Sequence, residues 1–238
     1  MRIQTGFTLL EVLVAVAISA TVGVAAVQLL SNIAQVNKTS IGKADELAAL
    51  QRFNQILGRD VGQVIDRDIR DEYGDTLPSL MVGSGDYPLE MTIAGWRNSP
   101  ITEDPRSNLQ RIAYRTEDLL SEPCEPALER IAYEQGVSVE DAEVEGECFV
   151  RYYWPVLDRG DTSEAKSQVL YDRIEDVRFD IVVSSTSVLS AEESPEMSET
   201  DYWPPVSEED QLRPVAIRMY FTALGFGDIM RQWEISHD

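Results

Sequence analysis

One carboxylate lies inside a long apolar segment near the start of the chain. Residues 7–30 are predominantly apolar, and Glu11 is their only charged side chain. About 20 apolar residues are enough to span the hydrocarbon core of a bilayer. An ionised side chain at that depth costs on the order of several kcal/mol, so acids in such segments are rare and usually functional. Glu11 is therefore the first candidate functional residue.

The boundary of this segment differs from that of a secretory signal peptide, which has a shorter apolar region followed by a small-x-small cleavage site. Here residues 1–6 form a short hydrophilic leader, and Gly6 directly precedes the apolar run. A cut after Gly6 would free Phe7 and keep the apolar helix. A plain N-terminal anchor is one alternative, but it explains neither Glu11 nor this junction. A buried core helix is the other, and such a helix would rarely lie at the extreme N-terminus without caps.

Few other residues have the types and spacing that catalysis needs. His237 is the sole histidine, and the sequence contains no Gly-x-Ser-x-Gly elbow, P-loop or dinucleotide fingerprint. Pairs of acids such as Asp172 and Asp176 arise by chance in a chain with 42 acidic residues. We therefore expect no catalytic residues and no cofactor. A glycosidase or lytic enzyme that uses two carboxylates is the alternative.

Two cysteines, Cys124 and Cys148, could form a disulfide if the domain is exported. Closing a loop of that length would stabilise the fold by about 3 kcal/mol in the chain-entropy model. Two free buried thiols are the alternative. Two ligands make a poor zinc site, so we expect no metal there.

The charge of the chain is strongly acidic, with 20 Lys plus Arg against 42 Asp plus Glu and a formal net charge of −22. This balance disfavours nucleic acid and anionic membrane surfaces as partners. Residues 117–147 hold eleven acids and one base, and residues 184–210 are rich in Ser, Glu and Pro. Both stretches are interpreted as solvated surface excursions. A calcium site is the alternative, although neither stretch has the EF-hand spacing.

The apolar segment is predicted to continue as a helix from about Phe7 to Val64, because no proline occurs before Pro78. Residues 31–46 are mostly polar and form a neck. From Leu47 the pattern becomes amphipathic, which predicts that one stripe packs on a sheet. The stripe consists of Leu47, Leu50, Phe53, Leu57, Val61 and Val64.

Residues 65–238 show a period of two, which indicates strands. Alternating segments occur around residues 88–96, 108–116, 148–157, 176–185, 214–224 and 228–235, and in one of them Val177, Phe179, Ile181 and Val183 share a face. Gly225-Phe226-Gly227 between the last two segments predicts a hairpin. The fold class is therefore α+β, with a long N-terminal helix packed on largely antiparallel strands.

The stretch "GFTLLEVLVAVAIS" resembles the class III signal of type IV pilins and type II secretion pseudopilins at nearly every position. The resemblance implies that a prepilin peptidase cuts after Gly6 and methylates Phe7. Glu11 falls on the glutamate of that motif. A helix buried in a filament would leave this carboxylate in need of a cation, which the N-terminal ammonium of a neighbouring subunit can supply. Glu11 is thus predicted to be an assembly residue.

Later segments resemble the minor pseudopilin of the J type. They are "LQRFNQILGRDVGQVIDRDIRD" with the following "PSL", "PRSNLQRIAYR", "VLDR", "QVLYDRIEDVRFDI" and "RPVAIRMYFTALGFGDIMRQWEI". The resemblance implies a long helix against two small antiparallel sheets. It also implies a single-pass protein of the inner membrane with its C-terminal domain in the periplasm. Its partners would be the I- and K-type minor pseudopilins at the tip of the pseudopilus, and other pseudopilins. Residues 117–147 depart from the family pattern.

Two other functions are compatible with these residues. A minor pilin of a type IV pilus would share the whole N-terminal motif. A membrane-tethered periplasmic binding domain would predict no cleavage after Gly6 and no effect of changing Glu11.

A flank of the helix beside the stripe is the predicted contact with the I-type partner. It carries Ile41, Ala48, Ala49 and Ile56, which lie off the stripe. Small residues allow another helix to approach closely, and an unpaired apolar flank often marks an interface.

Overall fold

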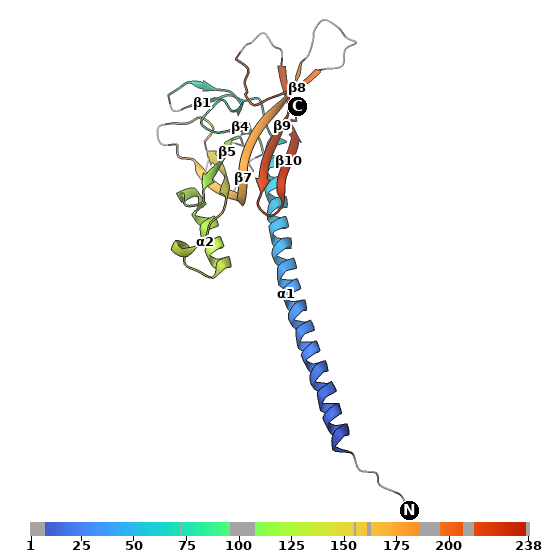
Figure 1. The fold of residues 1–238 in the computed structure, drawn as a ribbon. Helices are drawn as coiled ribbons and strands as arrows, with labels where there is room; N and C mark the ends of the chain where they lie inside the picture. Colours follow the sequence, from blue (N-terminus) through green and yellow to red (C-terminus); the bar gives the residue numbers. More distant parts are fainter. Residues whose placement is uncertain are drawn as a thin grey trace, which may run out of the picture. The chain divides into compact units, whose positions relative to one another are not determined.

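The computed structural model describes residues 8–71, 73–95, 108–154, 156–160, 163–185, 196–206 and 212–236. The chain divides into two compact units, residues 1–51 and residues 52–238 (Figure 1). The first unit consists, in its described part, of most of helix α1 (Leu9–Val61). The second unit contains the last turns of α1 and all described strands.

Helix α1 ends three residues before the predicted limit at Val64. Gly62 follows the last helical residue, and glycine is among the least favourable residues in a helix interior. The Gln63 amide bonds to the Asp60 carbonyl at 3.2 Å, a tighter turn than in an α-helix. Val64 instead forms a β-bridge with Ile93. The extended backbone therefore begins where the sequence pattern still suggests a helix.

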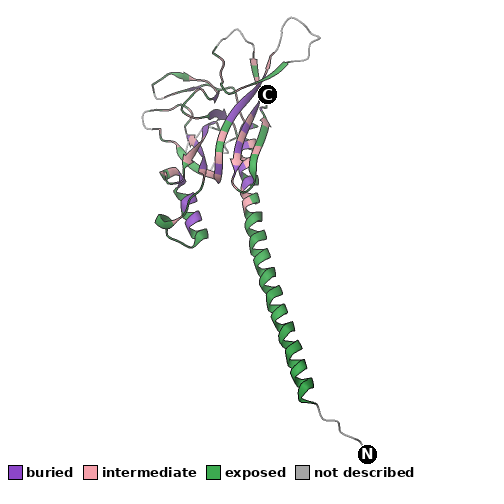
Figure 2. Cartoon of the chain, in the orientation of Figure 1, coloured by how far each residue is buried: buried purple, intermediate pink, exposed green. Residues whose placement is uncertain are grey.

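The described part of the first unit is a single helix whose side chains are exposed from Leu9 to Asp45 (Figure 2). Leu47, the first residue of the predicted stripe, remains 45% exposed. Its assignment to the packed stripe was wrong, because burial of the stripe begins only at Leu50, which is 8% exposed. Within the second unit, the stripe residues Phe53, Leu57 and Val61 are fully buried.

The second unit is an antiparallel β domain with one further helix, which confirms the α+β class. The strands are β1 (Ile69–Arg70), β2 (Thr76–Leu77), β3 (Leu80–Val82), β4 (Leu89–Ile93), β5 (Gln110–Asp118), β6 (Glu147–Trp154), β7 (Lys166–Ser185), β8 (Glu196–Thr200), β9 (Leu212–Ala223) and β10 (Gly227–Glu234). Helix α2 (Glu125–Gln135) lies between the short 3-10 helices η1 (Glu122–Cys124) and η2 (Val139–Asp141).

The described strands form two antiparallel sheets, one of eight strands and one of two, so one sheet is larger than the resemblance implied. The large sheet has the order β10-β9-β7-β6-β5-β4-β3, with β8 paired to β7, and β1 pairs with β2. Strand β7 is long enough to pair with β6 along its first half and with β8 along its second half. It therefore connects β6 to β8 within the large sheet. The predicted hairpin is present, because β9 and β10 pair from Ala223 and Gly227 outward.

Both faces of the central strands are covered. On one face, the Phe53 ring of α1 lies 5.2 Å from the Phe149 ring of β6 and 5.5 Å from the Phe221 ring of β9. On the other, Val150 and Trp154 of β6 pack with residues of η1 and α2. Successive side chains of a strand point to opposite faces. Burial along β5 and β6 is therefore nearly continuous although their hydrophobicity alternates.

The end of α1 lies close to the sheet at one glycine. A Cβ built on Gly58 would lie 2.9 Å from Cδ1 of Trp233 in β10, closer than real Cβ contacts. Gly58 thus permits an approach that a larger residue would block.

The acidic excursion at 184–210 contains a strand that its composition does not predict. β8 has the sequence Glu-Met-Ser-Glu-Thr and pairs with residues 181–185 of β7. These residues do lie on the surface, as interpreted, but they form a strand. Strand β7 runs past the end of its pairing with β6, and β8 supplies hydrogen-bonding partners for that free edge. Residues 186–195 and 207–210 of the excursion lie outside the described residues.

Candidate functional site

Within the described part of the chain, Glu11 in the first turn of α1 has no cationic partner. The Glu11 amide donates to Oγ1 of Thr8 at 3.3 Å, so Thr8 caps the helix and Glu11 is the third helical residue. A Thr-x-x-Glu order is that of a capping box. Among the described residues, no Lys or Arg forms an ion pair with Glu11. Gly6 and Phe7 lie outside the described residues.

The helix that carries Glu11 has the length and composition of a membrane span. An 18-residue window of α1 has a mean hydropathy of 2.3 and none of it is buried. Figure 2 shows the same stretch as exposed throughout. An exposed apolar helix of this length needs a lipid or protein environment to cover it.

The four residues of the predicted partner-binding flank differ in exposure. Ile41 is 55% exposed, whereas Ala48, Ala49 and Ile56 are half-buried. None of the four belongs to the buried core. The four side chains therefore lie outside the core, and their contact with a partner stays a prediction.

A buried ion pair attaches the end of α1 to the sheet. Asp60 is 1% exposed, and its Oδ2 accepts hydrogen bonds from the Tyr114 hydroxyl of β5 and from Nε of Arg151 of β6, both at 2.6 Å. Oδ1 of Asp60 accepts from Nη2 of Arg59 at 3.2 Å. Burial, together with the nearby Asp60 carboxylate, raises the pKa of Tyr114 well above its usual value. Tyr114 therefore stays a hydrogen-bond donor to Asp60.

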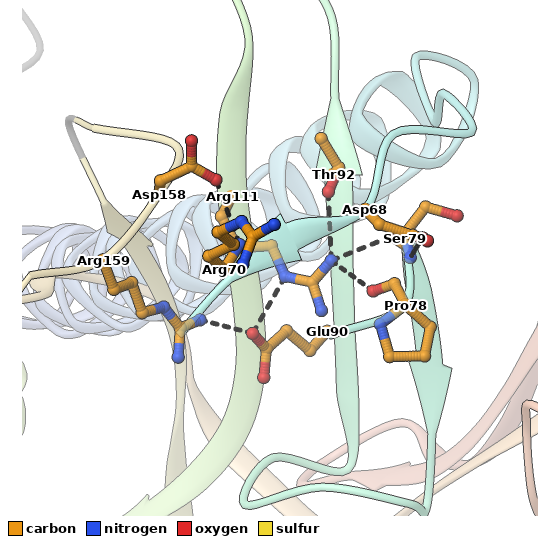
Figure 3. A network of polar contacts seen from close by, with 9 residues as sticks. All are labelled: Asp68, Arg70, Pro78, Ser79, Glu90, Thr92, Arg111, Asp158 and Arg159. Atoms are coloured by element: carbon orange, nitrogen blue, oxygen red, sulfur yellow. Dashed lines mark hydrogen bonds and ion pairs between the residues drawn. The ribbon is translucent and has the colours of Figure 1, made fainter. Parts of the chain in front are cut away.

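A second buried network lies on the opposite face of the sheet (Figure 3). Arg111 of β5 is fully buried, and its Nε donates to Oε1 of Glu90 at 2.9 Å. Its Nη1 donates to the carbonyls of Pro78 and Ser79 and to Oγ1 of Thr92. Arg159 also contacts Oε1 of Glu90.

Desolvation lowers the pKa of Arg111, while the attraction of Glu90 opposes that shift. The network joins β4, β5 and the link between β2 and β3 to the segment after β6. Its contacts are internal to the fold, which indicates a structural role.

The chain between β5 and β6 is an ordered insertion fixed by a disulfide. Cys124 and Cys148 are bonded, with their Cα atoms 6.2 Å apart, so the predicted pairing is present. Residues 125–135 of the insertion form helix α2. A small core of its own forms between α2, η1 and the sheet. It contains Ala113, Leu119, Cys124, Ala127, Ile131, Cys148, Val150, Tyr152 and Trp154.

Salt bridges also tie the insertion to β7. Arg130 of α2 pairs with Asp172, and Arg173 pairs with Glu134 at 2.9 Å. The interpretation of residues 117–147 as a solvated loop was therefore wrong for their inner face. The apolar residues of α2 recur at helical spacing and are buried against the sheet. Among the described residues, no group of three or more His, Cys, Asp or Glu side chains is placed to hold a metal ion.

Replacing both Cys124 and Cys148 by serine is expected to lower the free energy of unfolding by about 2–4 kcal/mol, because the bridge no longer restricts the unfolded chain. Urea unfolding followed by circular dichroism measures this loss. Reductant should destabilise the wild-type protein to a similar extent and leave the double variant unchanged. An unchanged unfolding midpoint in the double variant would contradict a stabilising role for the bridge.

Sequence reasoning missed the two buried networks, although one signal was available. Asp60 lies on the apolar stripe, three residues after Leu57 and directly before Val61. A lone acid on a buried helical face requires a partner. The identity of that partner depends on strand pairing, because Arg151 and Tyr114 lie opposite each other across β5 and β6.

The comparisons with known proteins agree with this geometry. Residues 1–27 match the prokaryotic N-terminal methylation motif. A chain of the crystal structure of the GspK–GspI–GspJ complex from the enterotoxigenic Escherichia coli type 2 secretion system has a similar fold. The TM-score is 0.53 at 21% identity, covering 81% of this chain and 99% of that one. At this identity the likeness establishes the fold alone.

Curated relatives of the same type share more sequence. Type II secretion system protein J of Escherichia coli is 33% identical over 121 residues, which make up 49% of this chain and 61% of that protein. The protein of the same name from Klebsiella pneumoniae is 33% identical over 135 residues, 56% of this chain and 64% of that protein. The matched part thus spans less than two thirds of either relative. The family model of type II secretion system protein J matches residues 28–235, so the chain belongs to that family.

Proposed function

We propose that this chain is a minor pseudopilin of a type II secretion system. It acts in a tip complex with I- and K-type minor pseudopilins, which initiates pseudopilus assembly for protein export across the outer membrane. The observation that carries the proposal is the match to the protein J family over residues 28–235, directly after an N-terminal methylation motif. The similar Escherichia coli structure is a GspK–GspI–GspJ complex, which supports the choice of partners.

The family and the single N-terminal apolar helix fit a protein anchored in the inner membrane. The finer topology is part of the proposal: residues 7–30 span the membrane once, and the domain of residues 65–238 lies in the periplasm. A disulfide suits that oxidising compartment. No observation favours a type IV pilus or a tethered binding domain over this reading.

Two surfaces of α1 mediate assembly in this proposal. The Glu11 carboxylate pairs with the methylated N-terminal ammonium of a neighbouring subunit, since no described cation of its own chain satisfies it. The flank of Ile41, Ala48, Ala49 and Ile56 contacts the I-type partner, and its exposed and half-buried side chains support that role. Other pseudopilins would continue the fibre below the tip.

Processing of the N-terminus tests the proposal at its first step. The mature protein is expected to begin at Phe7 and to carry one N-methyl group, because prepilin peptidase would cut after Gly6. Intact-mass measurement on protein extracted from membranes gives the answer. The Gly6→Leu variant, which removes the small residue at the cleavage site, should keep its leader and serves as the control. A wild-type mass that retains residues 1–6 would refute the pilin-like reading.

A further inference from the structure

The end of the insertion exposes a group of apolar side chains. We define the α2 knob as residues 133–145, which comprise the last turn of α2 and the loop after it. Tyr133 is 87% exposed, and Val137, Val139 and Val144 are 38–43% exposed. In Figure 1, α2 and this loop project beyond the ends of the neighbouring strands. Exposed apolar residues gathered on one short segment often mark an interaction site.

The knob is held in a defined conformation. Gly136 ends α2 in the left-handed region at φ 72°, and the Val137 amide bonds to the Ala132 carbonyl at 3.1 Å. The Gln135 side chain bonds the backbone of Glu143 twice, at 2.6 and 2.9 Å, which folds the loop back onto the helix. The disulfide and the buried face of α2 fix its base. A preorganised surface loses little conformational entropy when a partner binds.

Exposed acids without an ion-pair partner in the described part of the chain occur in the knob and one turn before it. Arg130 is the sole base of residues 117–147, and it already pairs with Asp172. The carboxylates of Glu129, Glu140 and Glu143 are exposed and form no ion pair within the described part of the chain. An apolar centre with a rim of one charge sign has the anatomy of a protein interface.

We propose that the α2 knob docks on a protein surface that carries basic side chains around an apolar depression. Tyr133 would insert into the depression, and the surrounding carboxylates would pair with Lys or Arg. A second copy of this chain is a poor occupant, because each copy has a formal net charge of −22. Anionic lipid and nucleic acid are repelled for the same reason. This surface lies on the β domain and shares no residue with the α1 flank.

Binding of a cationic probe tests the apolar half of this inference. The probe is a fluorescein-labelled peptide in which lysines flank leucines, titrated with full-length protein in dodecyl maltoside, with empty micelles subtracted. Tyr133→Ser with Val139→Ser is expected to weaken binding about tenfold or more. Tyr73→Ser removes a ring that is 83% exposed elsewhere on the domain, and it should leave affinity unchanged. Equal binding by the wild-type protein and the knob variant would overturn the proposal.

A charge-matched pair of variants tests the electrostatic half. Glu129→Gln, Glu140→Gln and Glu143→Gln remove three charges at the knob. Glu164→Gln, Asp201→Asn and Glu234→Gln remove three exposed charges away from it. The three changes at the knob are expected to weaken the affinity for the peptide about tenfold and to reduce the salt dependence of binding. The three changes elsewhere should alter the affinity by less than about threefold. Equal losses in both sets would mean that only net charge attracts the peptide. A lysine–glutamine peptide that binds as tightly would exclude a role for Tyr133.

Discussion

Replacing Asp60 by alanine is expected to lower the free energy of unfolding by about 3–5 kcal/mol, the typical cost of breaking a buried ion pair by removing one partner. The change leaves the Arg151 guanidinium, which is 6% exposed, without the carboxylate that accepts from its Nε. It also removes the acceptor of the fully buried Tyr114 hydroxyl. In a domain of this size the thermal midpoint should fall by roughly 10 °C. Urea and thermal unfolding followed by circular dichroism measure both quantities.

Three variants separate this network from general effects of charge and volume. Tyr114→Phe removes one hydrogen bond and should cost about 1–2 kcal/mol. Asp60→Asn keeps the shape of the side chain, so its free energy of unfolding should lie between those of Asp60→Ala and the wild-type protein. Glu164→Ala, at an exposed position, should be neutral within about 0.5 kcal/mol. If Asp60→Ala unfolds at the same urea concentration as the wild-type protein, the network does not stabilise the attachment of α1.

The Glu11→Leu variant is expected to insert into the membrane and to be cleaved normally, yet to lose secretion by about tenfold or more. Removing the carboxylate eliminates its desolvation cost in lipid, so insertion is not impaired. In the proposed fibre it leaves the N-terminal ammonium of the neighbouring subunit buried and unpaired, which is strongly unfavourable. The measurements are the amount of exported protein and the co-purification of full-length partners from membranes.

Val12→Leu is the matched control for Glu11→Leu, because it changes the adjacent residue of the same exposed helix without altering charge. It should secrete at the wild-type level. Processing is scored separately by intact mass, so a failure of cleavage is distinguishable from a failure of assembly. Unchanged secretion and co-purification in Glu11→Leu would show that the carboxylate has no role in subunit pairing.

The elements predicted most accurately are those whose local pattern agrees with their environment. The helix could be predicted because no proline interrupts the apolar run, the polar neck and the amphipathic stripe, and the hairpin of β9 and β10 because glycines bracket Phe226. Cys124 and Cys148 could be paired because the chain contains no other cysteine. Glu11 stood out because its charge conflicts with its surroundings.

The features that could not be predicted from the sequence depend on contacts between segments that are distant along the chain. β8 is polar and forms because the end of β7 offers a free edge, which no local pattern records. Asp60 forms an ion pair with Arg151, which is 91 residues away in the sequence. This partner can be identified only once the position of β6 against the helix is known. The exposure of Leu47 was mispredicted because a helical stripe shows which residues share a face, but not where along it packing begins.

The continuity of α1 into the β domain also has a mechanical consequence. The last turns of the helix bury Phe53, Leu57 and Val61 against the sheet, with Asp60 bonded to two strands. A pull along the helix axis therefore loads these contacts together in shear, instead of opening them one after another as in peeling. Withdrawal of the helix would require the hydrophobic core to rupture at the same moment. Resistance to tension is then governed by the unfolding barrier of the whole β domain.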